Sequence, residues 1–243
     1  MVKLAVFLAA GMSSRFKQFT NDKPKGFLKI NNESLIERSI KILLKYNIEK
    51  IIIGTGYCSE HYEKLSEKYP VVTKKNTVYE TTNSFYTLHN MQDIIDEDFL
   101  LLESDLLYEK RAIIHLQNSS LDDIILASGK TNSTDEVYIE TDINMILINM
   151  SKNKDDLKRI SGELVGISKI SMETFQKVCS LFQKEKTLLK KIAYEIALTK
   201  LSQKSPIKVD KIDDLVWTEI DNEKHFNRAI NIIYPKILEK ESG

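Results

Sequence analysis

The sequence predicts an α/β fold in which a mixed, mainly parallel sheet lies between two layers of helices. Short apolar runs alternate along the chain with stretches of helical period, which is the pattern of parallel strands connected by helices. Residues 99–102 are wholly apolar, as expected for a strand that is buried on both faces. The 243 residues, 42% of them hydrophobic, suffice for one large domain over 1–243, and no linker is evident.

The individual elements follow from these periods. Ser34, with Glu37 three residues later, predicts a capping box at the start of a helix. Residues 140–142 predict a hairpin turn in a more antiparallel, inserted region, and Asn222 predicts the cap of the last helix. The expected strands are 4–8, 51–53, 71–73, 99–102, 124–127, 137–140, 144–148, 162–167, 207–209 and 216–220, and the expected helices are 34–46, 61–68, 82–91, 172–181, 188–200 and 222–238.

Composition restricts the class of partner. The 35 basic and 35 acidic residues balance and form no basic stripe, which argues against nucleic-acid binding. No apolar run approaches the roughly 20 residues that span a bilayer, and the start lacks a basic leader with a cleavage site. Cys58 and Cys179 share no metal-like spacing with the four histidines and are expected to be free thiols. We therefore expect a cytoplasmic protein with a small-molecule partner and no membrane association.

The segment 8–16, at the end of the first strand, is the most informative motif. Its small residues let backbone N–H groups approach an anion without a Cβ in the way. Arg15 and Lys25 add fixed positive charge, and residues 1–30 hold six basic residues against one acidic residue. This pattern predicts a triphosphate-binding loop and nucleotidyl transfer. An ordinary strand-to-helix turn made of small residues is the alternative.

Two carboxylates follow predicted strands at points where ligands gather in open α/β sheets. Asp105 comes after the apolar strand 99–102, and Asp221 comes after the strand 216–220. Hard oxygen ligands of this kind are those that Mg²⁺ prefers, and phosphate oxygens and waters complete its shell. The pair predicts a magnesium site, with a helix-capping aspartate as the alternative for each residue.

The motif LAAGMSSR at 8–15, followed by Pro24 and Lys25, resembles the signature of the sugar-nucleotidyltransferase-like superfamily, L-A-A-G-x-G-x-R followed by P-K. Ser13 stands where the second glycine of that loop is expected. The resemblance implies a three-layer, Rossmann-like sheet of the nucleotide-diphospho-sugar transferase type. Further segments resemble the 2-aminoethylphosphonate cytidylyltransferases, with the phosphocholine cytidylyltransferases as close neighbours: 23–27, 80–88, 128–141, 149–152, 162–168 and 217–221.

This resemblance implies that the phosphonate oxygen of 2-aminoethylphosphonate attacks the α-phosphorus of CTP and releases pyrophosphate. Asp105 and Asp221 match the paired aspartates that hold Mg²⁺ in the family. Because the nucleophile is already an anion, catalysis reduces to alignment and charge cancellation. Arg15 can bridge the β- and γ-phosphates, Lys25 can stabilise the α-phosphate, and Lys152 can neutralise the phosphonate. For Lys152, an ordinary turn lysine is the alternative.

Nucleotide recognition is expected from main-chain groups and short side chains. For Tyr57 the alternative is a half-buried loop aromatic, and for Asn83 it is a helix cap. The residues expected to bind the nucleotide are Leu8, Ala9, Ala10, Gly11, Met12, Ser13, Ser14, Gly56, Tyr57, Asn83, Ser84 and Ser104.

The acceptor amine separates the two related families. A quaternary ammonium is held by an aromatic cage, whereas a primary ammonium needs carboxylate or carbonyl acceptors. Val137 follows two acids with no aromatic directly beside them, although Tyr138 is next and Trp217 could approach. This favours 2-aminoethylphosphonate over phosphocholine. The acids that are candidates to pair with the ammonium are Glu80, Asp135, Glu136 and Glu163.

A catalytically silent nucleotide-binding module of the same fold is the alternative from another functional class, since fold does not determine function. The complete set of Arg15, Lys25, Asp105 and Asp221 favours an enzyme. A homodimer and a transaminase as a functional partner are compatible with the resemblance, and the sequence decides neither.

Overall fold

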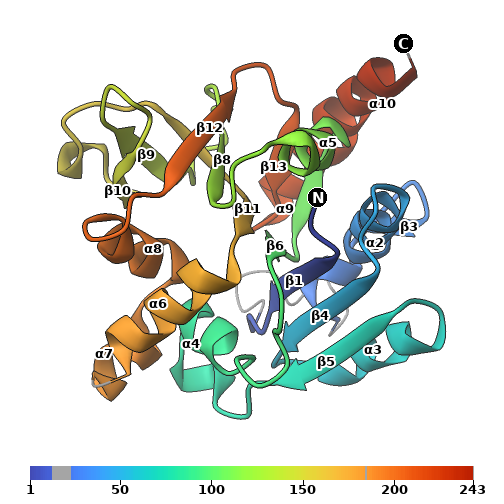
Figure 1. The fold of residues 1–243 in the computed structure, drawn as a ribbon. Helices are drawn as coiled ribbons and strands as arrows, with labels where there is room; N and C mark the ends of the chain where they lie inside the picture. Colours follow the sequence, from blue (N-terminus) through green and yellow to red (C-terminus); the bar gives the residue numbers. More distant parts are fainter. Residues whose placement is uncertain (13–22, 184, 243) are drawn as a thin grey trace.

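The structure, a computed structural model, describes residues 1–12, 23–183 and 185–242. Within these ranges, nine strands form one mixed sheet, in which β10, β9, β11, β6, β1, β4 and β5 follow one another and β8 joins β11 to β12 (Figure 1). The first half of the sheet is parallel, because β1 pairs in parallel with β4 and β6, and β4 with β5. Strand β11 then runs antiparallel to β6, β8 and β9. The strands span β1 Leu4–Ala9, β4 Lys50–Thr55, β5 Val71–Lys75, β6 Phe99–Glu103, β8 Ile124–Ser128, β9 Tyr138–Thr141, β10 Leu147–Ser151, β11 Gly162–Ile170 and β12 Lys208–Ile212.

Helices cover both faces of this sheet (Figure 1). Alternate residues of β1 serve the two layers: Val6 packs with α4, α6 and α8, whereas Phe7 packs with α2 and α5. Residues from α9 and α10 form a smaller third cluster with Leu107 and Ile220. The helices span α2 Leu35–Lys45, α3 Ser59–Glu63, α4 Ser84–His89, α5 Arg111–Asn118, α6 Met172–Phe182, α7 Lys186–Lys191, α8 Tyr194–Ser202, α9 Glu223–Arg228 and α10 Tyr234–Ser242.

Two small sheets extend this framework. Strand β7, Leu106–Tyr108, pairs antiparallel with β13, Trp217–Glu219. This pairing brings β13 beside the residues that follow β6. Strand β2, Lys29–Ile30, pairs with β3, Glu33–Ser34. The β7–β13 pair is the one that positions the site described below.

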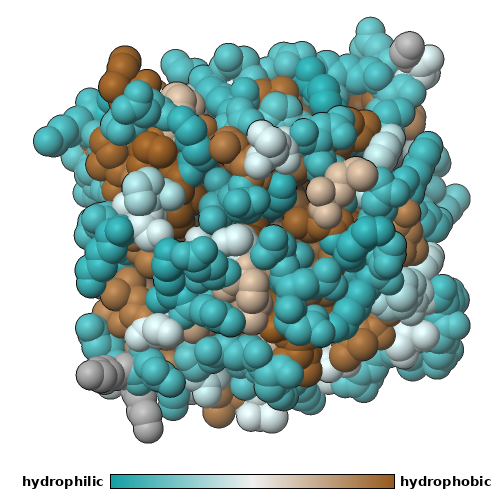
Figure 2. All heavy atoms as spheres, viewed as in Figure 1, coloured by the Kyte–Doolittle hydropathy of each residue, from teal (hydrophilic) through white to brown (hydrophobic). Residues whose placement is uncertain are grey.

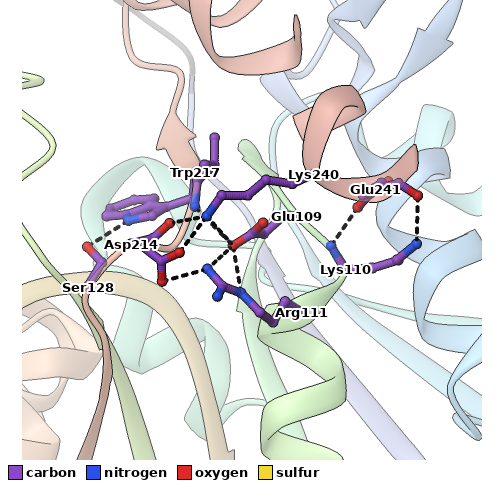
Figure 3. A network of polar contacts seen from close by, with 9 residues as sticks. Glu109, Lys110, Arg111, Ser128, Asp214, Trp217, Lys240 and Glu241 are labelled. Atoms are coloured by element: carbon purple, nitrogen blue, oxygen red, sulfur yellow. Dashed lines mark hydrogen bonds and ion pairs between the residues drawn. The ribbon is translucent and has the colours of Figure 1, made fainter. Parts of the chain in front are cut away.

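A network of charged groups ties the C-terminal helix to this region (Figure 3). Lys240 contacts the Asp214 carboxylate at 2.8 Å and the Glu109 carboxylate at 3.9 Å. Arg111 joins the same two acids, at 2.9 Å and 2.7 Å. Lys240 and then Arg111 lower the pKa of Asp214 to about 2. Because Asp214 lies three residues before β13, the network holds the chain shortly before it enters that strand.

The expected elements are largely confirmed. Ser34 accepts a hydrogen bond from the main-chain N–H of Glu37, which confirms the predicted cap of α2. The Glu37 carboxylate returns to Ser34 through the serine hydroxyl, which donates to it, rather than through the main-chain N–H of a full capping box. Asn222 accepts from the N–H of His225 and caps α9 as expected. The helix predicted over 61–68 is instead α3 followed by a 3₁₀ turn, Lys64–Glu67.

Two of the predicted elements, a helix and a strand, are wrong. The helix expected over 188–200 is broken into α7 and α8, because Ile192 and Ala193 are extended. The strand expected over 144–148 begins only at Leu147. Before it, the Asp142 carboxylate accepts main-chain hydrogen bonds from Asn144 and Ile146 and holds them in a turn. The sequence analysis also missed β7 and α5.

The surface is mainly polar. Figure 2 shows one face on which hydrophilic atoms predominate and hydrophobic atoms reach the surface in scattered patches. Among the described residues, Ile143 is the most exposed large hydrophobic side chain, at 87%. In the same part of the chain, none of the helices combines the length and the apolar character needed to cross a membrane.

The cap of α2 makes a testable contribution to stability. We expect Ser34→Ala to lower the free energy of unfolding by about 1 kcal/mol, because the N–H of Glu37 loses its acceptor at a buried helix start. Urea unfolding followed by circular dichroism measures the change. Ser120→Ala, at an exposed serine outside any helix or strand, is the matched control and should change it by less than about 0.5 kcal/mol.

Candidate functional site

A cavity of about 590 Å³ opens at the carboxyl ends of β1 and β6, where ligands bind in open α/β sheets. We refer to it as the main cavity. Its wall combines the end of β1, the turn that carries Lys25, the start of α4, the end of β6 and the start of α8. Its lining residues are Leu8, Ala9, Ala10, Gly11, Met12, Pro24, Lys25, Tyr62, Tyr79, Glu80, Thr82, Asn83, Ser84, Thr87, Glu103, Ser104, Asp105, Val137, Lys152, Ala193, Tyr194, Glu195 and Glu219.

Lys25 lies between the two aspartates that the sequence analysis paired. Its ammonium is 3.0 Å from Asp105 Oδ2 and 2.5 Å from Asp221 Oδ1. Burial alone would lower the pKa of Lys25, but the attraction of Asp105 and then of Asp221 outweighs it, so the net pKa is raised. Lys25 is therefore protonated at neutral pH. Both aspartates contact the same ammonium group.

The position of Lys25 depends on a close backbone approach. Lys25 begins a 3₁₀ turn, Lys25–Phe27, after Pro24. A Cβ placed on the buried Gly26 would lie 2.9 Å from the Tyr62 hydroxyl and 3.0 Å from the Ser104 carbonyl oxygen. Glycine is thus required for this turn to pack against the end of β6, and this packing brings Lys25 beside Asp105.

Three acids form a second group on the same wall. Carboxylate oxygens of Glu103, Asp105 and Glu219 all lie within 4.8 Å of one another. Burial raises the pKa of Glu103 well above its usual range, and repulsion from Asp105 adds to this. Burial and then repulsion from Glu103 and Asp105 raise the pKa of Glu219 as well. The raised pKa values mean that Glu103 and Glu219 hold protons more readily than isolated carboxylates and would release them to a cation, and the group offers the hard oxygen donors that suit Mg²⁺.

The sequence analysis missed Glu103, Glu219 and Tyr194. The Tyr194 hydroxyl donates to Glu103 Oε1 at 2.8 Å. Gly166 has a φ of +78°, and a Cβ there would lie 2.9 Å from Glu103 Oε2, so the glycine leaves room for this carboxylate. The break between α7 and α8 starts α8 at Tyr194 and brings this residue to the cavity. Glu103 and Glu219 each lie two residues before an aspartate that was predicted to bind the metal. This spacing was the signal in the sequence that could have identified them.

The structure brings most of the expected nucleotide-binding residues to one wall. Gly56 and Tyr57 are not among the described residues that line the main cavity. A Cβ on Gly56 would lie 2.6 Å from the Ala10 carbonyl oxygen, so Gly56 packs closely against the residues that follow β1. Arg15, Ser13 and Ser14 lie outside the described residues. The expected residues that line the cavity are Leu8, Ala9, Ala10, Gly11, Met12, Asn83, Ser84 and Ser104.

Asn83 and Ser84 also have structural roles. The Asn83 side chain accepts from the N–H of Ser84 as the cap of α4, which was its alternative interpretation. Its amide donates to the Lys191 carbonyl oxygen at 3.2 Å. Ser84 Oγ accepts from the N–H of Tyr194 at 2.9 Å. These bonds hold the start of α4 against α7 and α8 while both residues face the cavity.

A second, smaller space adjoins the main cavity, and we refer to it as the side pocket. It has a volume of about 20 Å³ and shares Glu103, Val137 and Glu219 with the main cavity. Five of its lining residues are acids, and one is aromatic. The lining residues are Glu103, Thr131, Ser133, Asp135, Glu136, Val137, Leu164, Gly166, Trp217, Thr218, Glu219, Asp221 and His225.

The four acids expected at the amine take different positions. Asp135 and Glu136 line the side pocket, and Glu80 lines the main cavity. Glu163 lines neither, and its Oε2 accepts from the main-chain N–H and the hydroxyl of Thr131 at 2.8 Å and 2.7 Å. Lys152 lines the main cavity and contacts Asp135 at 2.8 Å. The structure thus links Lys152 of the main cavity to Asp135 of the side pocket, and it places Glu136 in the same pocket.

Glu136 is held in its charged form. It accepts from the N–H of Thr134 at 3.0 Å and from the Tyr138 hydroxyl at 3.0 Å. Burial would raise its pKa, but these hydrogen bonds, the main-chain donors above all, outweigh burial and lower it. Glu136 is therefore an anion at neutral pH.

His225 connects the side pocket to Asp221. The main-chain N–H of Asp221 points to His225 Nδ1 at 3.4 Å, so Nδ1 accepts. Nε2 is 3.0 Å from the Ser133 carbonyl oxygen and therefore carries the proton. The ring is a neutral imidazole that joins the end of β13 to the loop containing Ser133. The sequence analysis did not single out this buried histidine.

Comparison with known proteins agrees with this architecture. The model of the MobA-like NTP transferase domain family matches residues 5–143, which is more than half of the chain. The chain belongs to this family. The matched region runs from β1 through β6 and the end of β9, and so includes Lys25 and Asp105.

Two of the similar proteins are cytidylyltransferases. A choline-phosphate cytidylyltransferase from Haemophilus influenzae is 36% identical over 97 residues, which is 40% of this chain and 42% of the relative. A 2-aminoethylphosphonate cytidylyltransferase from Lancefieldella rimae is 31% identical over 104 residues, or 42% of each chain. The alignments thus span less than half the length of either relative.

A solved structure confirms the fold. The CTP:phosphocholine cytidylyltransferase of Streptococcus pneumoniae superimposes with a TM-score of 0.82, over 95% of this chain and 99% of that chain, at 21% identity. The predicted Rossmann-like sheet of the nucleotide-diphospho-sugar transferase type is therefore confirmed. At this level of identity the match concerns the arrangement of the elements.

The close approach at Gly26 leads to a prediction. We expect Gly26→Ala to lower the free energy of unfolding by about 1–3 kcal/mol, because the new methyl group overlaps the Tyr62 hydroxyl and the Ser104 carbonyl. In the double variant Gly26→Ala/Tyr62→Phe, loss of the hydroxyl should restore part of this stability relative to Tyr62→Phe alone. Urea unfolding of the four proteins gives the coupling energy, and strict additivity would contradict the packing described here.

Proposed function

We propose that the protein transfers CMP from CTP to 2-aminoethylphosphonate with release of pyrophosphate. The observation that carries the proposal is a nucleotide-sized cavity with a paired cation, joined to a water-sized pocket whose wall holds five acids. The family assignment and the names of the partial relatives support nucleotidyl transfer with CTP. The two spaces support the division into a nucleotide side and an amine side.

The main cavity suits a nucleoside triphosphate. Its volume of about 590 Å³ falls within the range of small-molecule sites, roughly 300–1,000 Å³. The end of β1 presents main-chain groups of Ala9, Ala10 and Gly11 along its wall, as expected for contacts to phosphate or base. Lys25 lines the same cavity. The predicted contribution of Arg15 to the β- and γ-phosphates concerns a residue outside the described ranges.

The side pocket suits a primary ammonium. A volume of about 20 Å³ accepts about one water-sized group. An –NH₃⁺ group has this size, whereas three methyl groups on nitrogen exceed it. The wall offers carboxylates from Asp135 and Glu136, and Trp217 is its one aromatic among the described lining residues. An aromatic cage for a quaternary ammonium would need more than one ring.

Magnesium fits the acids around Lys25, where Asp105 lines the main cavity and Asp221 lines the side pocket. Asp105 and Asp221 converge on the Lys25 ammonium, and Glu219 lies within reach of Asp105. We propose Asp105 and Asp221 as the metal ligands, with Glu219 beside them. Bound there, the ion would neutralise phosphate charge and orient the triphosphate.

The chain's own residues then act by alignment and charge cancellation. The phosphonate oxygen forms a bond to the α-phosphorus while the bond from that phosphorus to the bridging oxygen breaks, and the electron pair leaves on pyrophosphate. Lys25 stabilises negative charge on the α-phosphate, and Lys152, which links the main cavity to Asp135 of the side pocket, neutralises the incoming phosphonate. Since the nucleophile is an anion, no group has to remove a proton from it.

Pyrophosphate release is the direct test of the proposal. Purified protein with CTP, Mg²⁺ and 2-aminoethylphosphonate should release pyrophosphate in step with formation of the cytidylyl-phosphonate ester, detected by ³¹P nuclear magnetic resonance. Binding of CTP without turnover on any acceptor would instead identify a catalytically silent module.

The metal assignment predicts a matched set of variants. Asp105→Asn and Asp221→Asn should each lower Mg²⁺-dependent turnover more than about a hundredfold, because each removes a hard anionic ligand and a partner of Lys25. Circular dichroism checks that both variants fold. Asp122→Asn, at an exposed aspartate, is the control and should retain full turnover. Losses below tenfold in both test variants would refute the assignment.

The size of the side pocket predicts acceptor choice. We expect kcat/KM for 2-aminoethylphosphonate to exceed that for phosphocholine at least about tenfold, which corresponds to ~1.4 kcal/mol of transition-state binding. Glu136→Gln should raise KM for 2-aminoethylphosphonate and reduce this preference. Glu163→Gln is the matched control, because its carboxylate bonds to Thr131 and lines neither space. Equal use of both acceptors would exclude the phosphonate assignment and leave cytidylyl transfer standing.

A further inference from the structure

A third hollow lies on the side of α4 away from the β1 loop. It is a groove of about 650 Å³ between the second half of α4, the end of β5 and the α6–α7 region, and it shares no lining residue with the main cavity or the side pocket. We refer to it as the peripheral groove. Its volume is as large as that of the main cavity and lies within the range of small-molecule sites.

The wall from α4 carries an aromatic platform. Tyr86 and His89 follow one another on one side of the helix, with ring planes 14° apart and centroids separated by 6.5 Å. Burial lowers the pKa of His89, so this ring is neutral at physiological pH and presents a π-face. Two nearly parallel rings of this kind form a surface on which a planar heterocycle can stack.

A cation stands above this platform. The Lys190 ammonium lies 6.0 Å from the centre of the Tyr86 ring, at the outer limit of a cation–π contact, and it forms no ion pair with any described residue. Lys74 also lines the groove but is paired with Asp93 at 2.6 Å. Among the described residues that line the groove, Lys190 is therefore the cation that carries no ion pair and can meet an anionic ligand.

Amide side chains complete the wall. Asn90, Gln92 and Gln183 line the groove and offer both donors and acceptors. Asn90 and Gln92 use their NH₂ groups on the carbonyl oxygens of Lys75 and His89. Their side-chain oxygens accept no hydrogen bond from the described residues, and such free amide acceptors suit the edge of a nucleobase.

We propose that the peripheral groove is a second nucleotide site, which stacks a base on Tyr86 and His89 and binds its phosphate at Lys190. The inference does not depend on the reaction in the main cavity. The groove is nevertheless connected to that cavity, because the main-chain carbonyl of Lys190 accepts from the N–H of Asn83 at 2.8 Å. A ligand held by Lys190 thus contacts the segment that orients Asn83 in the main cavity.

The test is titration calorimetry with AMP as the probe on the full chain. Lys190→Glu and Tyr86→Leu should each weaken AMP binding at least about tenfold, since one removes the phosphate partner and the other the stacking face. Lys190 is exposed, so its variant tests the site even where Tyr86→Leu lowers stability. Adenosine and inorganic phosphate, titrated separately, should bind more weakly than AMP.

Two controls separate the groove from the main cavity. Lys25→Gln changes the main cavity, and Lys236→Glu makes the same charge change on α10; both should bind AMP within about twofold of the unaltered protein. Three results would overturn the inference: no AMP binding at millimolar concentration, binding that survives Lys190→Glu, or binding that is lost in Lys25→Gln. The last would place AMP in the main cavity.

Discussion

The ion pairs of Lys25 with Asp105 and Asp221 are the interaction on which the site depends. They join residues that are 80 and 196 positions apart in the chain, and thus the first turn, the end of β6 and the end of β13. Burying three charges is costly, and each partner left alone would be an uncompensated buried charge. The β7–β13 pair positions Asp221 at the end of β13, and the close approach at Gly26 positions Lys25 beside Asp105.

The raised pKa values of Glu103 and Glu219 characterise the walls around Lys25. Burial raises the pKa of both acids first; repulsion from Asp105 adds to this at Glu103, and repulsion from Glu103 and Asp105 adds to it at Glu219. A group of acids in this state gains stability from any cation that enters. The same physical property therefore serves the proposed metal at the main cavity and the proposed ammonium at the side pocket, which share Glu103 and Glu219.

The two halves of the sheet contribute different functions to this arrangement. The parallel half, β5–β4–β1–β6, ends in loops with small residues and in the turn of Lys25, which suits a phosphate chain. The antiparallel strand β11 supplies Gly166 to the side pocket, and the loop before β9 supplies Glu136 and Val137. Under the proposed function, the acceptor is bound in one half of the molecule and the nucleotide in the other. The partial relatives, whose names differ in the acceptor, are consistent with this division.

The fold class, most strands and helices, the cap at Ser34 and the proximity of Asp105 to Asp221 followed from the sequence, because local periodicity and strand-end position are properties of short segments. That Lys25 forms ion pairs with both aspartates was not predicted. The predicted roles of these three residues remain predictions. Only the tertiary structure decided that Glu103, Glu219 and the start of α8 join them. Burial, the break before α8 and the clustering of acids arise from long-range packing, and no local pattern encodes which distant side chains will share one cavity.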